Sequence, residues 1–158
     1  MDVTTQLLQL LSQKQQQFET YKQYTQILLE CDSEIMTDYI TKREALANEI
    51  DAINKKINDI CAAHPQQALL KEILLLHPNY SDVPAEFKPV FAAVQQIFAQ
   101  INYITGLNSQ IIQRAQNERD EAKAQLVEKK NTPKIVRYLT NLTPGEDDGA
   151  LTISNKKA

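Results

Sequence analysis

The chain has 158 residues and a mass of 18.0 kDa, which is the size of one domain or one elongated unit. With only 3 Gly and 6 Pro, it lacks the turn residues of a loop-rich β-sandwich and the glycine-rich loops that hold phosphates. A net charge of −3 argues against binding to nucleic acid through neutralised phosphates, so no nucleic-acid partner is expected. The composition instead predicts an all-α protein made of long amphipathic helices.

The start of the chain and its cysteines bear on location. The opening sequence MDVTTQ has no basic segment followed by an apolar one, so no signal peptide is expected. No apolar run approaches the length of a membrane span, and no membrane insertion is expected. Cys31 and Cys61 match no zinc or redox spacing and are interpreted as buried free thiols in a reducing compartment. Together these features predict a cytoplasmic location.

The first half of the chain is regular, because no Gly or Pro interrupts it between Met1 and His64. Side chains that are apolar or tolerate burial recur there at alternating spacings of three and four residues, the repeat of one helix face. The pattern predicts one helix over residues 4–62, about 90 Å long, and leaves a kink near residues 31–33 open. The repeating positions include Leu7, Leu11, Lys14, Phe18, Tyr21, Thr25, Leu28, Leu46 and Ile53.

Two further helices are predicted after this one. Pro65 ends the first helix, and the leucine-rich segment that follows predicts a short helix over 66–76. A second stripe of apolar residues predicts a long helix over 84–130, with Ile101 and Ile112 on its most densely apolar part. Gly106 lies in the interior of that helix and is interpreted as a place where another helix approaches closely.

The architecture that buries both long stripes is an elongated antiparallel hairpin resembling a coiled coil, formed by residues 1–130. Its two long helices pair along their lengths, and the short helix lies at the turn. The composition then changes, so that 131–158 is predicted to be a flexible tail.

Within this tail, a proline at the first helical position predicts a short partner-binding helix over 132–142 that is not stable alone. The residues predicted to form its apolar, partner-binding face are Ile135, Tyr138, Leu139 and Leu142.

An enzyme needs reactive groups that converge on a pocket, and the sequence offers few of them. His64 and His77 both precede prolines at predicted helix ends, where capping or exposure is the simpler interpretation. No Glu-x-x-His pair, nucleotide-binding motif or nucleophile motif occurs. We therefore expect no enzymatic activity, catalytic residue, metal site or cofactor. By elimination, the function that the sequence favours is the binding of other proteins through helical surfaces.

The sequence resembles the FlgN-like flagellar export chaperones. The most specific stretch is ITGLNSQIIQRAQN over 104–117, in which Asn108, Ile111 and Ile112 match a family asparagine and the aliphatic pair that follows it. Thr105 stands where the family usually has an earlier asparagine. The opening helix, with the segment KREAL over 42–46, is also similar to the family, whereas the compact Tyr-Gly pairing of the family's tail is missing.

The resemblance implies a function. Chaperones of this family hold hook–filament junction proteins before secretion, shield their terminal helices and deliver them to the flagellar type III export gate. The family's tail carries much of the cargo contact, and a tail tyrosine takes part in docking to the gate. Tyr138 is the position to which that role would transfer.

Two alternatives to an export chaperone stay open from the residues themselves. A structural coiled-coil or adaptor protein would bind partners through the same helical surfaces, and an enzyme would require a site that the sequence does not reveal. A homodimer also stays open, because long apolar stripes can pair between copies. The identity of the cargo and the stoichiometry of binding are not encoded in any recognisable motif.

Overall fold

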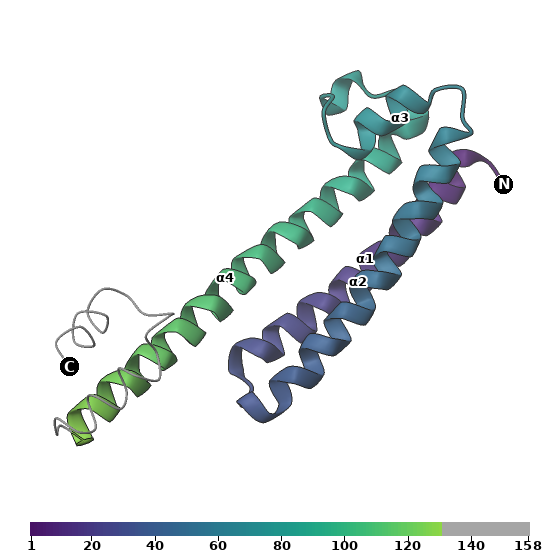
Figure 1. Ribbon diagram of the computed structural model, residues 1–158. Coiled ribbons are helices and arrows are strands. Elements are labelled where there is room, and N and C mark those ends of the chain that lie inside the picture. Colours follow the sequence, from purple (N-terminus) through teal and green to yellow (C-terminus); the bar gives the residue numbers. More distant parts are fainter. Residues whose placement is uncertain (131–158) are drawn as a thin grey trace, which may run out of the picture. The chain divides into compact units, whose positions relative to one another are not determined.

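The structure is a computed structural model that describes residues 1–130, with side chains up to residue 127. These residues are helical almost throughout, and no strand occurs among them, which confirms the predicted all-α class for this part of the chain. None of the described helices is long and apolar enough to cross a membrane. The elements, in chain order, are α1 (Val3–Glu30), α2 (Ser33–Ala62), α3 (Gln67–Leu74), the 3₁₀ turns η1 (Tyr80–Asp82) and η2 (Ala85–Phe87), and α4 (Lys88–Lys130) (Figure 1).

The first predicted helix is in fact two helices. Cys31 (φ −79°, ψ 160°) and Asp32 (φ −72°, ψ 155°) both have extended backbones, so the chain leaves the helix there. α2 then doubles back beside α1 (Figure 1). The prediction of one continuous helix over 4–62 is therefore wrong. The break lies within residues 31–33, where the sequence pattern leaves a kink open.

The reason for the break is burial. The start of α1 packs against the end of α2 in one core, with Leu7 and Leu11 on one side and Ile53 and Ile57 on the other. Each large aliphatic side chain that is removed from water contributes about 1.5–3 kcal/mol. Two residues outside helical conformation give up only a few backbone hydrogen bonds, each with a net contribution of about 1 kcal/mol. A hairpin of α1 and α2 is therefore more favourable than one straight helix whose apolar face would stay exposed to water.

Helix α3 ends in a defined capping motif. The Leu76 N–H donates to the Ile73 carbonyl at 3.0 Å, and the His77 N–H donates to the Glu72 carbonyl at 3.1 Å. This is the Schellman arrangement, in which the residue after the cap takes a left-handed backbone. Leu76 has a φ of 57°, where glycine is usual. The helix predicted over 66–76 thus ends two residues early, in a turn that satisfies its last carbonyls.

The chain divides into one compact unit, Met1–Ile111, and a second unit that begins at Ile112. In the first unit, the opening part of α4 packs against both helices of the α1–α2 hairpin, so three helices replace the predicted pair of long ones. Polar contacts join α4 to α1 as well: the Gln15 Nε2 donates to the Gln96 Oε1 at 2.7 Å, and the Gln100 Nε2 donates to the Gln15 carbonyl at 3.2 Å. The core consists of Leu7, Leu11, Ile53, Ile57, Cys61, Leu70, Ile73, Val83, Phe87, Val90, Phe91, Val94 and Ile97.

The buried face of α4 continues to Leu107 and stops there. Ile104 and Leu107 are buried, whereas Ile112 is 59% exposed. The expectation that Ile112 lies in a buried interior is wrong, and Ile101 is only half-buried. Helical periodicity reports which residues share a face, but it does not report how far a neighbouring helix covers that face.

Gly106 is not a contact point between helices. A Cβ atom built on Gly106 meets nothing within 4 Å, which contradicts the close approach expected from the sequence. Gly106→Ala is therefore expected to raise the free energy of unfolding by about 0.5–1 kcal/mol, since alanine loses less backbone entropy in a helix. Urea denaturation measures this change. Ala99→Gly, at an exposed interior position of the same helix, should lower the stability by a similar amount, and a destabilised Gly106→Ala variant would contradict the prediction.

Candidate functional site

Arg43 on α2 links this helix to both α1 and α4. Its Nη1 donates to the Thr25 Oγ1 on α1 at 3.2 Å and to the Asn108 Oδ1 on α4 at 2.8 Å. Its guanidinium lies 5.1 Å from the centre of the Tyr21 ring. Thr25 is fully buried, and its hydroxyl donates to the Tyr21 carbonyl at 2.8 Å. We call Arg43, Thr25, Tyr21 and Asn108 the arginine cluster.

The arginine cluster explains part of the family-like pattern. Arg43 and Asn108, 65 residues apart, come from the two segments that carry the resemblance, and the structure places them in direct contact. Asn108 therefore has a structural role that needs no ligand. Of the other two motif residues, Ile111 is half-buried and Ile112 is exposed, so only Ile112 is available to a partner.

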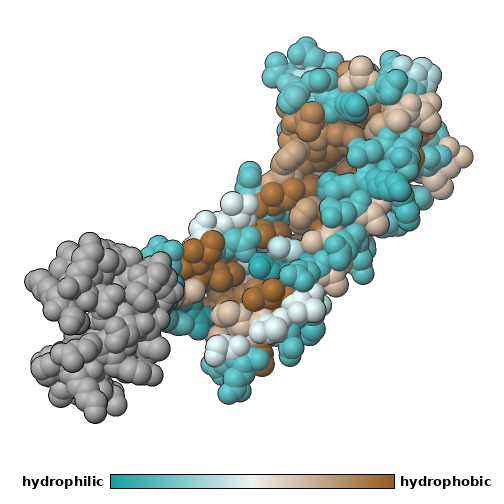
Figure 2. Space-filling view, in the orientation of Figure 1, coloured by the Kyte–Doolittle hydropathy of each residue, from teal (hydrophilic) through white to brown (hydrophobic). Residues whose placement is uncertain are grey.

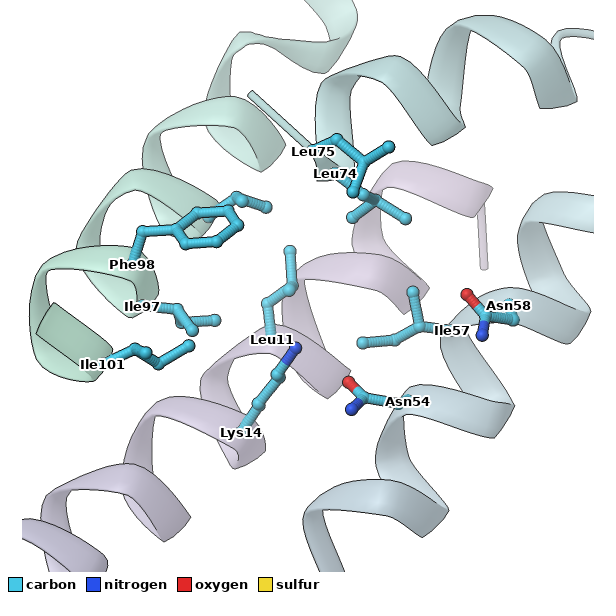
Figure 3. Close-up of a pocket in the computed structure, with 11 residues that line it drawn as sticks. Leu11, Lys14, Asn54, Ile57, Asn58, Leu74, Leu75, Ile97, Phe98 and Ile101 are labelled. Atoms are coloured by element: carbon cyan, nitrogen blue, oxygen red, sulfur yellow. The ribbon is translucent and has the colours of Figure 1, made fainter. Parts of the chain in front are cut away.

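A groove with a volume of about 300 Å³ lies between α1, α2, α3 and α4 within the first unit (Figure 3). Along one side, α4 presents Val94, Ile97, Phe98 and Ile101, which share a helix face at spacings of three and four residues. Leu11 on α1 and Ile57 on α2 close the opposite side, and Leu74 at the end of α3 and its capping residue Leu75 close one end. The brown hydrophobic surface beside α3 and along the hollow next to α4 is visible in Figure 2.

Three polar residues interrupt this apolar lining. Asn54 and Asn58 lie on α2, and Lys14 extends from α1 into the space between the helices (Figure 3). Burial lowers the pKa of the Lys14 ammonium below the usual value of a lysine. Within residues 1–127, no hydrogen bond or ion pair engages Lys14. The groove therefore combines an apolar floor with one desolvated positive charge.

In the second unit, the described part of α4 presents a stripe of exposed side chains. Three large apolar residues are on its surface: Ile112 is 59% exposed, and Leu126 and Val127 are each 43% exposed. Ala115 and Ala122 lie between them at helical spacing. We call residues 112–127 the exposed stripe. Local polar pairs stabilise this segment, including the Arg114 Nε and Glu118 Oε1 at 2.9 Å.

The remaining candidates have structural roles. The His64 Nδ1 accepts a hydrogen bond from the Gln66 N–H at 3.0 Å, and the His77 Nδ1 lies 2.6 Å from the Glu72 Oε2. Cys31 and Cys61 are both buried, and they form no disulfide. Among the described residues, no group of three or more His, Cys, Asp or Glu side chains is placed to hold a metal ion.

The predicted partner-binding residues Ile135, Tyr138, Leu139 and Leu142 lie outside the described residues.

Sequence reasoning missed the arginine cluster and the groove. The signal for the groove was present, since Lys14 interrupts an otherwise apolar helix face. Nothing comparable marked Arg43, because a partner 65 residues away is not visible in a local pattern.

No family model, curated protein or solved structure matches this chain.

Proposed function

We propose that this protein is a cytoplasmic export chaperone of the FlgN-like kind, which binds hook–filament junction proteins and delivers them to the flagellar type III export gate. The exposed stripe carries the proposal. Large apolar side chains exposed on a helix are typical of a surface that binds a partner helix. The likeness of residues 104–117 to the family supports the same assignment.

A chaperone that shields an aggregation-prone helix needs exposed apolar surface and no reactive group. The described residues provide such a surface. The exposed stripe offers Ile112, Leu126 and Val127, and the predicted partner helix over 132–142 follows it directly in the sequence. Within the proposal, cargo binding uses both segments, and Tyr138 contacts the cargo or the gate.

The test is binding of purified hook–filament junction proteins by titration calorimetry. Removing residues 131–158 is expected to leave the melting temperature nearly unchanged, because the core formed by the described residues lies within Met1–Ile111, and to weaken cargo binding strongly. Tyr138→Ala is expected to weaken binding by about tenfold or more, since it deletes buried contact area. Lys134→Ala should weaken cargo binding less, because it removes a single charge whose attraction water and salt screen.

A matched pair of variants tests the exposed stripe. Ile112→Asp should weaken cargo binding, whereas Gln116→Asp, at an exposed position of the same helix, should not. Equal binding by both variants and by the truncated chain would remove the basis for this function. Selective binding of some other coiled-coil protein, with no affinity for junction proteins, would favour the alternative of a structural or adaptor protein.

A further inference from the structure

Lys14 is unusual because its charge has no partner in the described part of the chain. Its side chain extends among the apolar residues that line the groove (Figure 3). The other polar side chains in that lining, Asn54 and Asn58, are neutral amides, and the lining contains no carboxylate. Taking a charge out of water without a partner costs free energy, so buried charges in proteins are usually paired. A partly buried ammonium without an anionic partner on the wall of a groove is suited to accept an anion from a binding partner.

The shape of the groove indicates what kind of partner this is. Val94, Ile97, Phe98 and Ile101 follow one another along two turns of α4, or about 10 Å of helix. Phe98 is 36% exposed and Leu75 is 55% exposed, so apolar surface at the edge of the groove is open to a partner. A helix laid between two helices presents apolar side chains at the same spacings, which is a common mode of peptide recognition.

We propose that this groove binds two turns of an amphipathic helix from another protein, with a carboxylate beside its apolar face that pairs with Lys14. The apolar side chains of that helix enter between α4 and the α1–α2 hairpin. Its glutamate or aspartate accepts hydrogen bonds from the Lys14 ammonium, and the amides of Asn54 and Asn58 belong to the same groove lining. The groove belongs to residues 11–101, so this site goes beyond the cargo-binding surface proposed above.

The probe for this site is a synthetic helical peptide. It has about 18 residues, enough to hold a helix in a complex, with leucines along one face, one glutamate beside them, and alanine and glutamine elsewhere. Calorimetric titration of the full-length protein should show binding. Lys14→Met keeps a long unbranched side chain, and it is expected to weaken binding by about 10- to 100-fold, because a charge-assisted hydrogen bond is lost. A peptide with glutamine in place of the glutamate should bind wild type and Lys14→Met alike.

Two controls separate the groove from general charge attraction and from misfolding. Lys55→Met removes an exposed charge of α2 outside the groove lining and should change binding by about twofold or less. Lys14→Met should also raise the melting temperature at pH 7, since it removes a desolvated charge. The difference in melting temperature between Lys14→Met and wild type should shrink as the pH rises from the lowered pKa of Lys14 towards the ordinary lysine value. In that pH range the Lys14 side chain of the folded wild-type protein becomes neutral while that of the unfolded protein is still charged, so folding no longer buries a charge.

Three results would overturn the proposal. They are no binding of the acidic peptide to wild type, equal weakening by Lys14→Met and Lys55→Met, and a sedimenting dimer of wild type that Phe98→Asp dissociates. The last result would assign the groove to a second copy of the chain. The measurement needs neither a junction protein nor residues 131–158, so its outcome is independent of the export-chaperone proposal.

Discussion

Phe87→Ala is expected to lower the free energy of unfolding by about 3–5 kcal/mol. Phe87 is 1% exposed and lies in the core that joins α1, α2, α3 and the opening part of α4. Its ring also packs edge-on against His64, with 6.0 Å between the ring centres. Truncation removes these contacts and leaves a cavity that α4 and the hairpin cannot close without moving. Urea denaturation followed by circular dichroism measures the loss.

Phe98→Ala is the matched control, because it removes the same atoms from a nearby position that is 36% exposed. Its loss of stability should be less than half that of Phe87→Ala, since much of the ring is already in contact with water. Equal losses for the two variants would mean that α4 packs with a different face towards the hairpin.

Loss of the arginine cluster should have the second largest effect on stability. Arg43→Met is expected to cost about 2–3 kcal/mol, because it removes two hydrogen bonds from a charged group in a partly buried place. Asn108 then loses the donor that lies 2.8 Å from its Oδ1, and Tyr21 loses its stacked guanidinium. Thr25 is affected less, since its hydroxyl still donates to the Tyr21 carbonyl.

A double-mutant cycle isolates the contact between Arg43 and Asn108. The double variant Arg43→Met/Asn108→Ala should lose less stability than the sum of the two single variants, by about 1 kcal/mol or more. Glu118→Gln provides the comparison, because it breaks an exposed ion pair with Arg114 on a single helix and should cost about 0.5 kcal/mol or less. Strict additivity of the Arg43 and Asn108 effects would show that their hydrogen bond does not stabilise the fold.

Local chemistry determined much of the secondary structure. The run without Gly or Pro up to His64 predicted helix, and helix is what residues 3–62 form on both sides of the break. The proline after His64 and the proline after His77 mark the chain segments where α2 and α3 have ended. The long helix predicted over 84–130 corresponds to α4, which begins at Lys88 directly after the 3₁₀ turn η2. Backbone propensity and proline sterics act within a few residues, so they can be read from a single sequence.

The candidate sites were predicted less completely, because each depends on residues that are distant in the sequence. The apolar stripe of α4 was visible, but the burial of Ile97 and Ile104 depends on the α1–α2 hairpin that packs against them. Lys14 was recognised only as a member of a helix face. Its place in a groove follows from the approach of α3 and α4, which no local pattern encodes.

By itself, then, the sequence determined that the chain forms helices, which faces of them are apolar and where prolines end them. The tertiary structure decided that the kink left open near residues 31–33 is a full break at Cys31 and Asp32, where the chain has neither glycine nor proline. It also decided that Arg43 meets Asn108 and that Lys14 lies unpaired in an apolar groove. The physical reason is that helix propensity is a sum over neighbouring residues, whereas burial is shared between residues far apart in the chain. Where the two compete, the larger free energy of burial determines the path of the backbone.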